Sequence, residues 1–236
     1  MNDYVIIICF WFDQWPVQNR PELGLKYIRN LYDGVKRNLS QPYRFYCFTD
    51  NPQSLVNNTV GIRTLPIDPV KDFRWNLKKI FPYCPACGLP PGHRALLIDL
   101  DVLITGPLDR LFESDSMFIT CQGVYRKKGI PGGSVSSFTT GDPDLYEYLW
   151  IPLEDKAKRL KLESITLGSE RKHLRQFMPK NKMVFWDDVC PGAVISYKND
   201  CRGSVVPVGR DASIIRFHGK PRPHEVNEPW IRNLWE

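Results

Sequence analysis

The first half of the chain alternates between buried-strand patterns and an amphipathic helical pattern. Tyr4–Phe10 is a continuous β-branched and aromatic run, typical of a strand buried on both faces. From Leu23 to Leu39 large apolar residues recur every four positions with basic residues between them, and Pro21 precedes them as at the first turn of a helix. Strand patterns return at Tyr43–Thr49 and, more weakly, at Gly61–Leu65. This alternation predicts an α/β fold with a parallel or mixed central sheet covered by helices.

The clearest central strand is predicted at Arg94–Ile98, and two carboxylates, Asp99 and Asp101, follow it directly. Ligands of such sheets bind beyond the carboxyl ends of the strands. If strand geometry persists, two carboxylates two residues apart point the same way and can hold one hard divalent cation, directly or through water. The alternative is that the pair caps the following turn at Thr105–Pro107.

A second candidate site lies near the C-terminus. A strand pattern there ends at His218 and Gly219, and Lys220 and Arg222 alternate with prolines. Imidazole binds Mn²⁺ as well as softer metals, glycine lets a ligand approach the backbone, and two fixed cations suit a diphosphate. By itself the segment is better explained as a basic surface turn.

The rest of the chain gives weaker patterns. A short helix is predicted over Trp75–Phe81 and a longer one from Asp144 to about Lys161. Short strands are predicted at Met117–Cys121, Ser134–Phe138, Ala193–Tyr197 and Ile214–Phe217. Since no internal repeat and no Gly/Ser-rich linker divides the sequence, we predict one domain over residues 1–236.

Together the two candidate sites resemble those of the nucleotide-sugar glycosyltransferases of the GT-A fold, especially the family 8-like group. The resemblance rests on LLIDLDVLITGPLDRLFE at 96–113 and FHGKPRPHEV at 217–226, with further matches at 32–52 (YDGVKRNLSQPYRFYCFTDNP) and 229–235 (PWIRNLW). It covers nearly the whole chain and is strongest to short bacterial or phage members. It implies a mixed, mostly parallel sheet flanked by helices, with a nucleotide-binding half at 1–106 and an acceptor-side half at 107–236.

The resemblance also implies an activity. The chain would be a metal-dependent hexosyl or pentosyl transferase that moves a sugar from a nucleotide-diphosphate sugar, with a UDP-sugar expected, to an acceptor hydroxyl with retention of configuration. Asp99, Asp101 and His218 would bind Mn²⁺ or Mg²⁺, and Lys220 and Arg222 would hold the diphosphate of the donor. Metal and cations would stabilise the charge that develops on the nucleoside diphosphate as it leaves.

Further positions are implied for the donor. Cys9 and Phe10 at the end of the first strand, and Asp50 after the second, would line the nucleotide pocket. Lys78, three residues after Trp75, matches the basic residue that family members place before the D-x-D strand.

Two stretches depart from the family pattern. Gly132-Gly133-Ser134-Val135 stands where the family has Asn-Ser-Gly/Ser-Val, and Gly168-Ser169-Glu170-Arg171 stands where it has Gly-Asp-Gln-Asp. Ser134 is the candidate contact to the donor in the first stretch. The candidate catalytic carboxylates are Asp101, Glu170 and Asp188.

The charge of the chain points to the acceptor. Lys156–Lys182, called here the basic segment, contains nine Lys and Arg residues against two Glu, whereas the whole chain has a net charge of only +6. The segment is either a solvated helix face or a surface for an anionic acceptor. In the second case the acceptor is nucleic acid, such as a hydroxymethylated DNA base, or a phosphorylated glycan or lipid head group.

Composition excludes several other classes of protein. With 42% hydrophobic and 25% charged residues, the chain is neither disordered nor fibrous. Tyr4–Phe12 is far shorter than the roughly 20 residues of a membrane helix, and no basic region precedes it as in a signal peptide. Seven loosely spaced cysteines favour reduced thiols and a cytoplasmic location, in a bacterium or a phage-infected cell. The lone C-x-x-C at Cys84–Cys87 is interpreted as a loop, with zinc binding as the alternative.

Two other functions remain open. A phosphatase of the haloacid dehalogenase type also places Asp-x-Asp after a hydrophobic strand and needs a later acidic pair, which Asp187–Asp188 would supply. Against it, Val102-Leu103 replaces the usual Gly-Thr. A non-catalytic nucleic-acid-binding protein would use the basic segment, but it would give Asp99, Asp101 and His218 no reason to converge.

Overall fold

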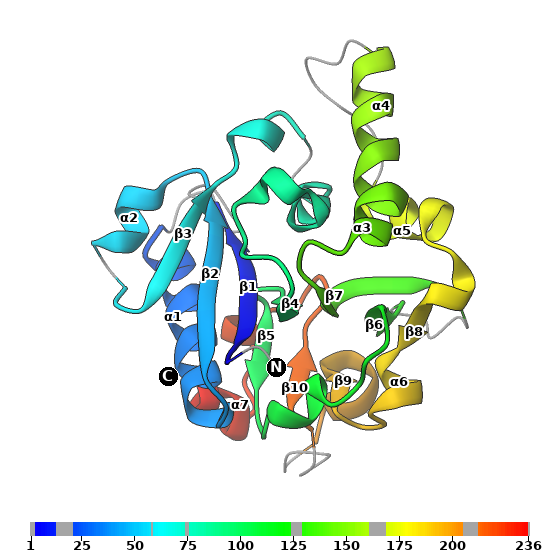
Figure 1. Cartoon of the computed structure of the whole chain (residues 1–236). Coiled ribbons are helices and arrows are strands. Elements are labelled where there is room, and N and C mark those ends of the chain that lie inside the picture. Colours follow the sequence, from blue (N-terminus) through cyan, green and yellow to red (C-terminus); the bar gives the residue numbers. More distant parts are fainter. Residues whose placement is uncertain are drawn as a thin grey trace.

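The computed structural model of the chain describes residues 3–12, 21–57, 59–73, 76–123, 129–160, 169–204 and 212–235 (Figure 1). Its central sheet has seven strands in the order β3-β2-β1-β4-β7-β6-β8. These strands are β1 (Val5–Trp11), β2 (Tyr43–Thr49), β3 (Ile62–Pro66), β4 (Arg94–Ile98), β6 (Phe118–Gln122), β7 (Pro131–Thr139) and β8 (Met183–Phe185). The predicted α/β class is confirmed, and β2 and β4 have the predicted bounds.

The first four strands form a parallel unit, in which β1 is buried along its whole length. β1 pairs in parallel with β2 and β4, and β2 pairs in parallel with β3. Alternate residues of β1 belong to two separate cores: Ile7 packs with Tyr27 and Leu31 of α1 (Pro21–Asn38), and Ile8 packs with Phe81 and Leu149 on the opposite face. Because both faces need apolar side chains, the strand reads as an unbroken hydrophobic run.

Two further helices were predicted from the sequence, and each differs from its prediction. The helix predicted from Asp144 is α3 (Pro143–Leu145) and α4 (Ile151–Leu160), joined by a π-helical turn. The helix predicted over Trp75–Phe81 is instead a 3-10 helix over Lys78–Tyr83, while Trp75 lies outside the described residues. Pro82 lies inside it and has no backbone N–H to give, which disfavours a regular α-helix there.

The second half of the chain adds antiparallel strands to the same sheet. β7 pairs antiparallel with both β4 and β6, and β6 pairs in parallel with β8, so the predicted mixed, mostly parallel sheet is confirmed. The remaining helices are α2 (Pro52–Val56), α5 (Glu170–Phe177), α6 (Trp186–Val189) and α7 (Pro229–Trp235). None of the described helices is both long and apolar enough to cross a membrane.

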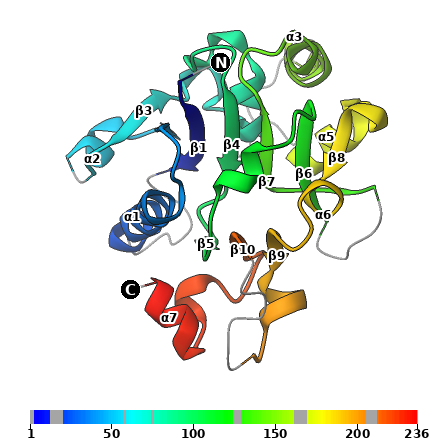
Figure 2. The ribbon, with the colours of Figure 1, turned by 60° about the horizontal axis from the view of Figure 1, so that its bottom comes forward.

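A small second sheet carries the C-terminal segment to the end of β4. It has the order β5-β10-β9, with β5 (Val102–Ile104), β9 (Val194–Ser196) and β10 (Ile214–Arg216). β10 runs antiparallel to β5, with Arg216 opposite Val102. Figure 2 shows β10 and β9 beside β5, beyond the end of β4. This pairing places residues near position 216 beside the D-x-D sequence.

The seven cysteines are free thiols, and six of them are buried. Cys84 and Cys87 flank a short 3-10 turn, where the Cys87 thiol donates to the Pro82 carbonyl at 3.6 Å. Burial raises the pKa of Cys87 to about 11, which keeps the thiol protonated at neutral pH. A protonated, buried thiol of this kind is typical of a structural cysteine.

Candidate functional site

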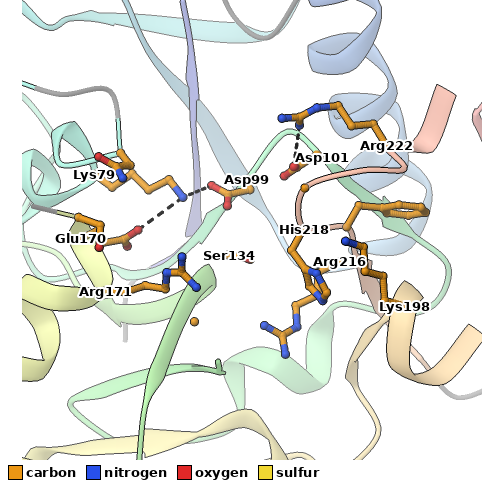
Figure 3. Close-up of a pocket in the computed structure, with 15 residues that line it drawn as sticks. Lys79, Asp99, Asp101, Ser134, Glu170, Arg171, Lys198, Arg216, His218 and Arg222 are labelled. Carbon is orange, nitrogen blue, oxygen red and sulfur yellow. Dashed lines mark hydrogen bonds and ion pairs between the residues drawn. The ribbon is translucent and has the colours of Figure 1, made fainter. Parts of the chain in front are cut away.

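A cavity of about 500 Å³ lies where β4 ends and the small sheet begins. Figure 3 shows its charged side chains, with Lys79, Glu170 and Arg171 on one side and Lys198, Arg216, His218 and Arg222 on the other. Asp99 and Asp101 lie between the two groups. Asn76, Ser134 and Ser169 also line it. Polar side chains from positions as far apart as 76 and 222 therefore line one cavity.

Strand pairing fixes the two aspartates. The Asp99 N–H donates to the Ser134 carbonyl at 2.9 Å, which extends the pairing of β4 with β7 by one residue. The Phe217 N–H donates to the Asp101 carbonyl at 2.9 Å, just beyond the β5–β10 ladder. The two sites singled out in the sequence thus lie in the same cavity.

Lys79 is the buried cation on the first side. Its side chain rises from the 3-10 helix, is 7% exposed, and forms ion pairs with Asp99 and with Glu170 Oε2, the latter at 3.5 Å. Burial lowers the pKa of Lys79, but the carboxylates of Asp99 and Glu170 outweigh it and raise the pKa above its usual range. Lys79 therefore stays protonated and neutralises part of the carboxylate charge.

Glu170 begins α5 and points toward Lys79. Ser169 caps the helix by accepting from the Lys172 N–H at 3.3 Å. The carboxylate passes directly over Gly133, where an added Cβ would lie 2.6 Å from Oε2 and where φ is +73°. Its other oxygen, Oε1, is buried and has no hydrogen-bond partner among the residues that the structure describes. Burial raises the pKa of Glu170 to about 7, although Lys79 acts in the opposite direction.

This pKa makes stability depend on pH. The folded state binds a proton at Glu170 between about pH 4.5 and 7 while the unfolded state has lost it, so stability falls as pH rises through this window. Glu170→Gln removes the titration. We expect the stability of the variant, relative to the parent, to rise by an amount on the order of 3 kcal/mol between pH 5 and pH 8. Urea unfolding at the two pH values measures it, and a constant difference between the proteins would contradict it.

Asp101 has its own cation. Its Oδ2 accepts from Arg222 Nη1 at 2.8 Å. Burial and the neighbouring Asp99 raise the pKa of Asp101 to about 7, and Arg222 and Lys79 counteract them. Lys220 is exposed instead and lies 3.9 Å from Glu225 Oε1, while the adjacent Gly219 lines the cavity.

The predicted metal ligands are engaged by other groups. Asp99 and Asp101 are each paired with a cation, and His218 Nε2 is hydrogen-bonded to Ser196 Oγ at 2.8 Å. Within the described ranges, no three His, Cys, Asp or Glu side chains form a group that could hold a metal. In this arrangement the three residues do not fit Mn²⁺ or Mg²⁺, and the metal assignment stays a prediction.

The remaining predicted residues lie in several places. Cys9 and Phe10 are buried in β1, where Phe10 stacks on Phe48 with ring centroids 5.0 Å apart. Asp50 is exposed at the end of β2. Lys78 lies over the ring of Phe12, 5.0 Å from its centroid, so that its neighbour Lys79 is the one that lines the cavity.

Ser134 and Asp188 are the other two residues that the sequence analysis predicts for the site. Ser134 lines the cavity from β7, whereas Asp188 is exposed on α6 and is not among the cavity residues. Four cavity cations were not assigned to the donor or the metal from the sequence: Lys79, Arg171, Lys198 and Arg216. Of these, Arg216 carried a signal, because an arginine in the apolar strand pattern before His218 is unusual.

No protein-family model and no curated protein sequence matches the chain. Solved structures of glycosyltransferases match it by fold. The galactosyltransferase LgtC, in complex with donor and acceptor sugar analogs, is 12% identical with a TM-score of 0.59, and the match covers 98% of this chain and 95% of that one. An active-site mutant of LgtC gives the same values.

The glycosyltransferase GlyE of Streptococcus pneumoniae TIGR4 is 14% identical with a TM-score of 0.64. That match covers 99% of this chain but only 60% of GlyE. Nearly the whole chain therefore has the fold of these enzymes, and the predicted GT-A fold is confirmed.

Proposed function

We propose that the chain is a glycosyltransferase that moves a sugar from a nucleotide-diphosphate sugar to an acceptor hydroxyl. The observation that carries the proposal is the position of the cavity: it lies at the end of β4, in a fold shared with LgtC over 98% of the chain. LgtC was solved with donor and acceptor sugar analogs. A sheet of this kind binds its ligands at the carboxyl ends of the strands.

The charges of the cavity suit this reaction. In the transfer, the bond from the anomeric carbon to the diphosphate oxygen breaks and a bond to the acceptor oxygen forms. Negative charge develops on the departing nucleoside diphosphate, and the cations across the cavity would stabilise it. Glu170, with a pKa near neutrality, would accept the proton of the acceptor hydroxyl.

The resemblance to family 8-like enzymes favours retention of configuration. On that course the acceptor hydroxyl approaches the face that the diphosphate leaves. One cavity would then have to contain both the carboxylate that takes the proton and the cations that hold the diphosphate. Glu170 and Arg216 line the same cavity. The anomeric configuration of the product decides this point.

The basic segment supports an anionic acceptor. Its described part includes α5, whose first turn contributes Glu170 and Arg171 to the cavity, and Lys172 and Arg175 are exposed on the same helix. A phosphate-bearing acceptor, such as nucleic acid or a phosphorylated glycan, would reach the cavity across this helix. The phosphatase alternative has less support because Asp187 and Asp188 are exposed on α6, outside the cavity lining.

A thermal-shift screen with UDP-, GDP-, ADP- and dTDP-sugars tests the donor. We expect one nucleotide class to raise the melting temperature by about 5–10 °C at a hundredfold excess over its dissociation constant. The same donor should release its nucleoside diphosphate when a suitable acceptor is added. No shift with any donor, together with hydrolysis of a phosphoester substrate, would favour the phosphatase instead.

A further inference from the structure

Arg216 is a buried cation that has no partner among the described residues. Its side chain is 5% exposed and lines the cavity, and neither Nε nor Nη1, both shielded from solvent, has a hydrogen-bond partner in the described part of the chain. Burying a charge without compensation costs several kcal/mol. A side chain held in this state at a cavity wall is typical of a site that an anion completes.

Gly132 and Gly133 leave room for two side chains of the cavity. A Cβ on Gly132 would lie 2.6 Å from the Gln122 carbonyl oxygen and 2.9 Å from Arg216 Nη1, and a Cβ on Gly133 would lie 2.6 Å from Glu170 Oε2. The two glycines are those that distinguish this chain from the family pattern at 132–135. At the two positions where the family pattern has larger residues, the side chains of Arg216 and Glu170 therefore occupy the space beside the glycines.

Two more cations line the cavity with Arg216, Lys198 on the same side and Arg171 on the opposite side. Lys198 and Arg171 line the same cavity, and Lys198 Nζ is 3.7 Å from the position of a Cβ on Gly219 (Figure 3). Among the described residues, none of the three forms an ion pair. Burial lowers the pKa of His218, and the positive charges of all three cations lower it further. We call Arg171, Lys198 and Arg216 the cation cluster.

The carboxylates of the cavity do not cancel this charge. Lys79 and Arg222 are paired with Asp99 and Asp101, and Lys79 also contacts Glu170. Among the described residues, the lining holds five Lys and Arg residues against three Asp and Glu, so even with all three carboxylates ionised it carries two excess positive charges. The diphosphate of a nucleotide sugar carries two negative charges at neutral pH, which this excess is enough to balance without an added metal.

We propose that the cation cluster is the diphosphate-binding site of the donor, and that it holds the diphosphate without a divalent metal. This inference rests on the proposed function. Arg216 supplies the two unpartnered donors, which suit the paired oxygens of a phosphate. Lys198, just after β9, and Arg171, in the first turn of α5, add positive charge. Both are more accessible to solvent than Arg216.

Calorimetric titration of the full chain with inorganic pyrophosphate, in EDTA, tests the inference. We expect the parent to bind, Arg216→Met to weaken binding about tenfold or more, and Lys198→Ala to weaken it about fivefold. Lys36→Ala is the matched control: this lysine is exposed in the last turn of α1, outside the cavity lining and outside the basic segment, and the variant should stay within about twofold of the parent. If Arg216→Met fails to fold, Lys198→Ala on the half-buried position carries the test.

Binding that requires Mn²⁺, or that is as tight in Arg216→Met and Lys198→Ala as in the parent, would overturn the inference. A nucleoside diphosphate should displace pyrophosphate. If only a phosphorylated acceptor displaces it, the cluster serves the acceptor and the donor assignment is wrong. If pyrophosphate binds in EDTA but no nucleotide sugar is cleaved, the cation cluster is supported and the proposed function is contradicted. If sugar transfer occurs but stops in EDTA, the proposed function is supported and the metal-free binding of the diphosphate is contradicted.

Discussion

Replacing Lys79 with methionine is expected to destabilise the protein by about 3–5 kcal/mol at pH 8. The ammonium group lies between Asp99 and Glu170, and the Lys79 side chain is almost entirely buried. Without it, two carboxylates face each other in a region of low dielectric constant, and their folded-state pKa values rise further. A raised folded-state pKa does not change the free energy of unfolding below the unfolded-state pKa of the carboxyl group. Above its folded-state pKa, the rise lowers that free energy by its full amount. The loss of stability should therefore be much smaller at pH 5 than at pH 8.

Urea unfolding of the variant at both pH values measures this loss. Lys78→Met is the matched control, because that side chain lies over Phe12 and its removal should cost less than about 1 kcal/mol. Adding Glu170→Gln to Lys79→Met should restore a large part of the stability at pH 8. Equal stability of Lys79→Met and the parent at pH 8 would mean that the buried cation does not hold the two carboxylates.

Glu170→Gln is expected to lower kcat for sugar transfer by about 10²–10⁴-fold, the usual range for loss of a general base. The amide keeps the size of the carboxylate but cannot take up a proton. Oε1 of Glu170 is buried at the cavity and has no hydrogen-bond partner within the described ranges, so its lone pairs can accept the proton of an acceptor hydroxyl. Donor binding, which we assign to the cation cluster, should change little.

Steady-state rates with the donor found in the thermal-shift screen measure the effect. Glu154→Gln is the matched control: Glu154 lies on α4 and is paired with Lys158 at 3.2 Å, on the surface. It should keep its rate within about twofold. A Glu170→Gln enzyme that keeps the parent's kcat would assign the proton transfer to another group, whatever its stability.

The central strands could be predicted from sequence because their burial on both faces leaves an unbroken apolar pattern. β2 and β4 have the predicted bounds, and β1 differs by one residue at each end. The 3-10 helix at Lys78–Tyr83 was predicted less well, since a proline inside a short apolar run shifts the local hydrogen bonding. Periodicity indicates which face of an element is buried, but it does not distinguish one kind of short helix from another.

The sequence by itself determined the fold class, the position of the D-x-D sequence at the end of a buried strand, and the His-Gly segment as the second part of the site. Only the tertiary structure decided which charged side chains form pairs. It placed Lys79 rather than Lys78 in the cavity, paired Asp101 with Arg222 across 121 positions, and gave Arg216 no partner among the described residues. The reason is physical: hydrophobic periodicity is local and appears in any short window, whereas the partner of a buried charge is set by strand pairing, here β5 with β10, between residues more than a hundred positions apart.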